Sequence, residues 1–197
     1  MHGLINTTLQ CFMRDTYGDA RWAKVLCALH LDAAGFEAML SYEDELTARL
    51  VSAIAEELGR LPGTLLEDVG HYLVSHPRRE ALRRLLRFSG RSFRDFLHAL
   101  DELPDRVRLA VPDLELPDID LKAVDENRIV FAIRDKPPGA SHVLLGLLRA
   151  MSDDYGALAI LDLTKGRGDR DLLSISVAQD RFSAGRAFSL AGEARTG

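Results

Sequence analysis

Apolar residues recur three or four positions apart through residues 1–110, which is the spacing of amphipathic helices. Glycine or proline interrupts this pattern, notably at Gly18, Gly59 and Pro77, and such residues commonly end helices. Gly70 lies inside one predicted helix, where a glycine indicates close packing or a bend. The pattern predicts helices over residues 3–17, 19–30, 43–58, 61–76, 82–88 and 89–109.

The last of these helices contains an unexpected residue. At about 100° per residue its apolar side chains share one face and its charged side chains the other. The apolar face holds Phe93, Phe96, Leu97, Leu100, Leu103 and Val107. Pro104 falls among these apolar positions, lacks an N–H and crowds the carbonyl of Leu100, so the helix should kink or stop there. Ser92 or Ser89 can cap its start.

The periodicity changes after residue 111, where Pro112 and Pro117 flank an extended link. Strands are predicted over residues 121–124, 128–133, 157–163 and 171–177, with a helix over 142–153 that Ser141 can cap. Helices followed by a small antiparallel sheet with one inserted helix predict an α+β fold. We expect one domain over residues 1–178, with a helical part at 1–110, a sheet-containing part at 111–178, and a weakly ordered tail at 179–197.

Composition restricts the class of protein and the kinds of partner that this domain can have. The chain has 197 residues, of which 47% are hydrophobic and 28% charged, as in soluble globular proteins. Its net charge of -5 argues against nucleic acid as a partner, because phosphate binding needs a basic surface. Polar residues interrupt the apolar N-terminus, and no apolar run reaches the length of about 18 that a membrane span needs. We expect a cytoplasmic protein without a membrane partner.

Candidate enzymatic chemistry is sparse. The acidic clusters at 43–45 and 153–154 lack a partner base, and their simplest interpretation is as charged helix ends. Cys11 and Cys27 have no metal-ligand spacing. No nucleophile–histidine–acid arrangement is visible, so we expect no enzyme. The basic cluster within 78–87 has two interpretations, a solvated helix face or a docking patch.

A family resemblance emerges at 96–107, where the pattern Phe-Leu-x-x-Leu-Asp-x-Leu-x-Asp-x-Val resembles the heme-binding helix of the heme-nitric oxide/oxygen-binding (H-NOX) family. Further matching segments lie at 17–22, 30–36, 42–44, 50–53, 65–72, 86–93 and 145–148, so the resemblance covers residues 1 to about 178. It implies an H-NOX-like fold with a ligand pocket. The pocket positions that it implies are Ile5, Gly70, Leu97, Leu100, Pro104, Pro117, Ile133, Val143 and Leu147.

Two departures from the family concern the heme itself. The family has a heme-ligating histidine where this chain has Pro104, which carries no donor atom for iron. The family's Tyr-x-Ser-x-Arg motif grips the heme propionates, and it falls here on Ile133, Asp135 and Pro137. A shift of one residue brings Arg134 and Lys136 to bear instead, but it exchanges the two faces of the strand and still supplies no tyrosine or serine.

These departures predict that no heme is held by the family's ligation and that heme binds only through another ligand. The alternative axial ligands are His71, His142 and His98, although each has a simpler interpretation as a surface or capping residue. The family's distal hydrogen-bond donor falls near Val143, which has none.

The resemblance therefore implies a cytoplasmic signalling domain that has lost the iron–histidine bond. Such a domain acts as a protein-binding adaptor or as a sensor of another apolar or tetrapyrrole ligand. The alternative is a heme-binding nitric oxide sensor with a non-family axial ligand. As partners, the family implies a histidine kinase or a cyclic-di-GMP enzyme.

Overall fold

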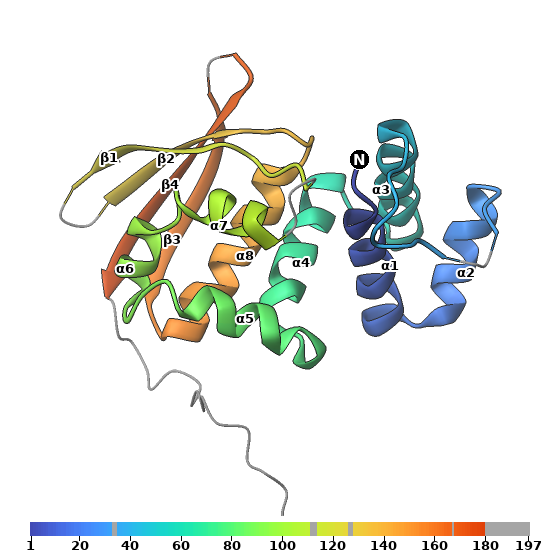
Figure 1. The fold of residues 1–197 in the computed structure, drawn as a ribbon, viewed down its shortest axis with the longest axis horizontal. Helices are drawn as coiled ribbons and strands as arrows, with labels where there is room; N and C mark the ends of the chain where they lie inside the picture. Colours follow the sequence, from blue (N-terminus) through green and yellow to red (C-terminus); the bar gives the residue numbers. More distant parts are fainter. Residues whose placement is uncertain (33–34, 111–113, 126–127, 167, 180–197) are drawn as a thin grey trace, which may run out of the picture.

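A computed structural model describes residues 1–32, 35–110, 114–125, 128–166 and 168–179. The N-terminal helices are α1 (Gly3–Tyr17), α2 (Asp19–Ala28), α3 (Asp44–Leu58), α4 (Pro62–Ser75), α5 (Glu80–Arg87), α6 (Phe93–His98) and α7 (Leu103–Ala110), with a short 3₁₀ turn at Pro77–Arg79. The strands β1 (Ile119–Val124), β2 (Arg128–Arg134), β3 (Leu158–Lys165) and β4 (Arg170–Gln179) follow, with α8 (Ala140–Tyr155) between β2 and β3. The α+β prediction is confirmed (Figure 1). The predicted tail at 179–197 lies outside the described residues beyond Gln179.

Local chemistry explains where several helices begin and end. The N–H of Gly18 donates to the carbonyl of Met13, and its φ of 87° suits glycine. Gly59 ends α3 in the left-handed conformation. Ser92 and Asp95 form a reciprocal capping box at the start of α6. The predicted ends at Gly18 and Gly59 and the predicted cap at Ser92 are confirmed.

The single helix predicted over 89–109 is instead two helices, α6 and α7. Residues between His98 and Leu103 form tight turns, in which the N–H of Leu103 donates to the carbonyl of Leu100. Pro104 therefore lies in the first turn of α7, where a missing N–H leaves no hydrogen bond unmade. The prediction of a break near Pro104 is right, but the break precedes the proline.

The four strands form one antiparallel sheet in the order β1-β2-β4-β3. Alternation along β2 buries Ile129, Phe131 and Ile133 on one face, and β4 buries Leu173, Ile175 and Val177 on the same side. Helices α6 and α8 cover that face in Figure 1.

Buried side chains form two hydrophobic cores. One joins α1, α2, α3 and α4, and the other joins α6, α8 and the sheet. Helix α4 contributes to both, since Leu65, Val69 and Tyr72 lie in the first core and Val74 lies in the second. Helix α4 thus connects the two parts of the domain along its packing surface with α8.

Helix α8 begins two residues earlier than predicted, at Ala140. Ser141 is therefore not a cap but lies within the first turn. Its N–H and its hydroxyl both donate to Oδ1 of Asp135, each at 3.0 Å. The carboxylate of Asp135, from the preceding loop, supplies the acceptor that a capping residue would otherwise provide.

Candidate functional site

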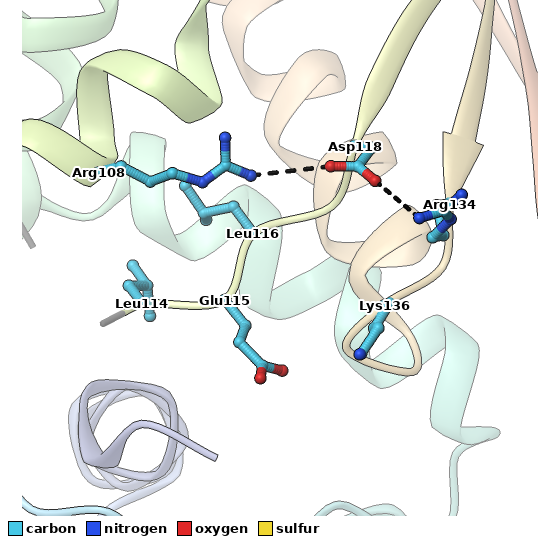
Figure 2. A pocket seen from close by; sticks show the side chains of 7 residues that line it. All are labelled: Arg108, Leu114, Glu115, Leu116, Asp118, Arg134 and Lys136. Carbon is cyan, nitrogen blue, oxygen red and sulfur yellow. Dashed lines mark hydrogen bonds and ion pairs between the residues drawn. The ribbon is translucent and has the colours of Figure 1, made fainter. Parts of the chain in front are cut away.

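A cavity of about 330 Å³ lies where the end of α7, the link before β1 and the end of β2 meet. Its walls are formed by Arg108, Leu114, Glu115, Leu116, Asp118, Arg134 and Lys136, as Figure 2 shows. The volume falls at the lower end of the range of small-molecule sites, roughly 300–1,000 Å³.

Backbone geometry brings these side chains together. The N–H of Arg134 donates to the carbonyl of Asp118 at 3.0 Å, which ties the link to the end of β2. Strand alternation turns Ile133 into the core and therefore turns Arg134 the other way, towards the cavity. Lys136 comes two residues later on the same side and is exposed.

Three cations face two carboxylates around this cavity, so its lining is net positive. Asp118 lies between the two arginines, with its carboxylate 3.1 Å from Nη1 of Arg134 and 3.7 Å from Nη2 of Arg108. Nε of Arg134 also lies 3.1 Å from Oδ2 of Asp169. Lys136 has no ion-pair partner among the residues that the structure describes. Its ammonium group is therefore the cation best placed to receive an anionic ligand.

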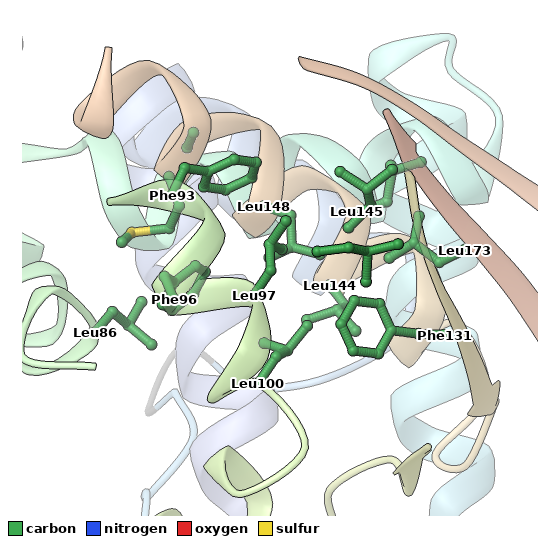
Figure 3. Packing of buried hydrophobic residues seen from close by; sticks show 14 of the residues in the cluster. Leu86, Phe93, Phe96, Leu97, Leu100, Phe131, Leu144, Leu145, Leu148 and Leu173 are labelled. Carbon is green, nitrogen blue, oxygen red and sulfur yellow. The ribbon is translucent and has the colours of Figure 1, made fainter. Parts of the chain in front are cut away.

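The nine pocket positions implied by the resemblance do not surround this cavity. Leu97, Leu100 and Ile133 are fully buried in the core between α6, α8 and the sheet, and Figure 3 shows Leu97 and Leu100 among the packed side chains. Their contact with a ligand stays a prediction.

The remaining predicted positions are spread over several elements. Gly70 packs against the backbone of α8 at Val143 and Leu147. Ile5 is half-buried on α1, Pro104 is buried in the first turn of α7, and Pro117 is half-buried between two lining residues of the cavity.

The three candidate histidines also lie away from the cavity lining. His71 is exposed, and its Nδ1 is 3.0 Å from the hydroxyl of Ser75. His142 is half-buried, with Nδ1 3.1 Å from the carboxylate of Glu67. His98 is exposed on α6. Within the described ranges, no three His, Cys, Asp or Glu residues gather into a metal-binding group.

The lining suits the carboxylate-bearing edge of a heme. Arg134 and Lys136 offer cationic donors, and Leu114 and Leu116 offer apolar surface. Neither they nor Pro104 offers an imidazole to iron. The residues present therefore fit the charged edge of the macrocycle but do not reproduce the family's iron ligand.

A family model described as HNOB, Haem-NO-binding, matches residues 2–159. The chain belongs to this family of haem-NO-binding sensor domains. Among curated proteins, soluble guanylate cyclase 89Da of Drosophila melanogaster is 24% identical over 160 residues, which cover 81% of this chain and 24% of that protein. Soluble guanylate cyclase gcy-31 of Caenorhabditis elegans is 23% identical over 154 residues, which cover 78% and 22%. The chain thus spans about a quarter of the length of these relatives.

Solved structures confirm the H-NOX fold. The Fe(II) unliganded H-NOX protein from K. algicida superposes with a TM-score of 0.76 at 18% identity, covering 96% of this chain and all of that one. An S. oneidensis H-NOX protein in the Fe(II)NO state gives a TM-score of 0.73 at 16% identity, covering 90% and 99%. Among the described residues, no helix has the length and apolar content to cross a bilayer.

Membership of the Haem-NO-binding family overturns the expectation that no heme cofactor belongs to this domain. That expectation rests on Pro104 and on a motif register that points to Ile133. In the structure Ile133 faces the core, whereas Arg134 and Lys136 line the cavity. The alternative register, shifted by one residue, is therefore the one whose side chains face a cavity.

Proposed function

We propose that this chain is the sensory domain of a signalling protein and that the cavity receives the carboxylate edge of a heme. The observation that carries the proposal is the position of Lys136 and Arg134 on the wall of a cavity in a Haem-NO-binding domain. Bound heme supplies an iron centre to which nitric oxide can bind.

The protein's own residues have separate tasks in this proposal. Lys136, which is free of an ion-pair partner among the described residues, donates to a heme carboxylate. Arg134 is held in place by Asp118 and adds a second cationic donor. Leu114 and Leu116 pack against the apolar part of the macrocycle. Glu115 and Asp118 limit the net positive charge, which favours a ligand with few carboxylates over a polyphosphate.

The test is a titration of the purified chain with hemin, followed by Soret absorbance, and a parallel titration with metal-free protoporphyrin, followed by fluorescence. Lys136→Glu should weaken the binding of both about 10- to 100-fold, because a charge-assisted hydrogen bond is replaced by repulsion between like charges. Lys122→Glu is the matched control, since Lys122 is an exposed lysine on β1 outside the cavity.

The two titrations distinguish the roles of the iron and of the carboxylates. Uptake of hemin alone, insensitive to Lys136→Glu, would show that the cavity does not hold the macrocycle. Failure to take up either compound would contradict the proposal and favour a protein-binding adaptor. A Soret band that shifts with nitric oxide would support gas sensing.

We further infer that the domain works in the cytoplasm and passes its signal to a histidine kinase or a cyclic-di-GMP enzyme. The relatives, which are soluble guanylate cyclases, support a signalling role, and the matched segment is a small part of each. The kinase or cyclic-di-GMP enzyme is what the family resemblance implies. The measurement is the rate of kinase autophosphorylation or of cyclic-di-GMP turnover, with and without the added chain. No change in either rate would contradict this assignment.

A further inference from the structure

Helix α5 presents large apolar side chains to solvent. Leu85 is 58% exposed and Phe88, which continues the helical backbone past Arg87, is 74% exposed. With Ala81, also exposed, they are spaced four and three residues apart, so they form one stripe along the helix. The opposite side of α5 meets the core through Leu86. A contiguous exposed apolar stripe on a helix is typical of an interaction surface.

Basic side chains flank this stripe. Residues 77–94 contain seven arginines and a single carboxylate, Glu80. Several of these arginines turn inward, as Arg83 and Arg87 do towards Asp154. Arg84 and Arg91 remain accessible beside the stripe. We call Arg84, Leu85, Phe88 and Arg91 the basic–apolar patch.

A second patch of opposite charge lies in the connector between α2 and α3. Met39 is 83% exposed and Leu40 is 49% exposed. Residues 37–45 contain four carboxylates and no basic residue, and Glu37, Glu43 and Glu45 are all exposed. We call Glu37, Met39, Leu40, Glu43 and Glu45 the acidic–apolar patch.

We propose that the basic–apolar patch on α5 of one copy docks on the acidic–apolar patch of a second copy of this chain. Each patch offers two large exposed apolar residues, and their flanking charges have opposite signs. The chain therefore carries both halves of a complementary contact, whereas any other partner would have to supply one. None of the residues of the two patches lines the cavity, and this inference does not depend on the proposed function.

The symmetry of the contact has a measurable consequence. A pair in which each copy's basic–apolar patch meets the other's acidic–apolar patch closes as a two-fold dimer, whereas a pair held by one contact is heterologous and continues into rings or chains. Both arrangements require association that rises with the concentration of the chain. We expect that association to weaken in high salt, because exposed charges steer and support it.

The experiment is sedimentation velocity over a range of concentrations. The weight-average sedimentation coefficient should rise with concentration, and Phe88→Ala or Met39→Ala should raise the dissociation constant at least about tenfold. Leu172→Ala is the matched control, because Leu172 is an exposed apolar residue of β4 outside both patches. Circular dichroism checks that each variant keeps its helices.

Charge reversal separates this contact from other kinds of association. Arg84→Glu with Arg91→Glu in one variant, and Glu43→Arg with Glu45→Arg in another, should each abolish self-association. A mixture of the two variants should associate again, because every contact between the two different variants pairs opposite charges. A chain that stays monomeric at all concentrations would overturn the proposal. So would reversal variants that associate like the original chain, or a mixture that stays monomeric.

Discussion

Gly70 on α4 lies directly against the backbone carbonyl of Val143 on α8. A Cβ atom placed on Gly70 would come within 2.0 Å of that oxygen, far inside van der Waals contact. The relationship is reciprocal, since a Cβ on Gly146 of α8 would lie 1.8 Å from the carbonyl oxygen of Glu67 on α4. Two glycines thus allow the backbones of α4 and α8 to touch.

Gly70→Ala should therefore destabilise the fold by about 1–3 kcal/mol, because the two helices have to separate to admit a methyl group. Urea unfolding measures the change. Gly63→Ala is the matched control on the same helix, since the three atoms nearest to its Cβ would belong to the side chain of His142 rather than to backbone. We expect Gly63→Ala to be neutral or stabilising by up to about 1 kcal/mol. Equal losses in both variants would contradict this explanation.

Stability should fall in acid through Asp15. Burial alone would raise the pKa of Asp15, but the hydrogen bond from Tyr72 and the charge of Arg78 outweigh it and lower the pKa. A lowered folded-state pKa contributes stability above the unfolded value of about 4, and this stability is lost as the pH falls through the folded value. Asp15→Asn should flatten the dependence of the urea midpoint on pH between about 5 and 2. An unchanged slope would exclude Asp15 as its source.

Ionisation of Tyr72 should reduce the stability of the fold at high pH. Burial, with the hydrogen bond to the carboxylate of Asp15, raises the pKa of Tyr72 to about 12. A raised pKa favours the neutral phenol in the folded state, so the stability is complete below about pH 10 and is lost as the pH rises through about 12. Difference absorption of tyrosinate between the chain and Tyr72→Phe measures this titration. A phenol that ionises near its ordinary pKa would contradict the buried contact.

Asp135→Ala should cost about 0.5–2 kcal/mol, because it leaves the N–H and hydroxyl of buried Ser141 without their acceptor. Asp135→Asn keeps an acceptor oxygen, so the loss should be smaller. Thermal unfolding of the two variants compares them. If asparagine were as damaging as alanine, the charge of Asp135 rather than its hydrogen bonds would be the stabilising feature.

Asp154 allows a buried ion pair to be compared with an exposed one. It is 8% exposed and lies 3.7 Å from Arg83 and 3.9 Å from Arg87. Asp154→Ala leaves two mostly buried guanidinium groups without this counter-charge, and we expect a loss of about 1–3 kcal/mol in urea unfolding. Glu80→Ala removes an exposed partner of Arg84 and should cost under about 0.5 kcal/mol. Similar losses would show that burial does not distinguish the two pairs.

The sequence predicts what local chemistry determines. Glycine at 18 and 59, the cap at Ser92 and the alternation of the strands were all visible in it, and the structure confirms them. The break between α6 and α7 could not be placed from the sequence, because Pro104 is compatible both with a kinked helix and with the start of a new helix.

Contacts between distant residues account for most of what the sequence leaves open. The arginines of α5 form a single basic cluster in the sequence, yet Arg87 turns inward to Asp154, 67 residues further along the chain, while Arg84 stays accessible. The cavity has the same origin, since Arg108 and Arg134 come together only once the sheet has formed. Spacing along the chain cannot indicate such partners.

Because helix α4 belongs to both hydrophobic cores, the two parts of the protein should not fold separately. Its side chains complete the packing of both cores, so a fragment cut on either side of it would expose apolar surface on the piece that lost it. Calorimetry should accordingly show one heat-absorption peak for the whole domain, and proteolysis should not release a stable half.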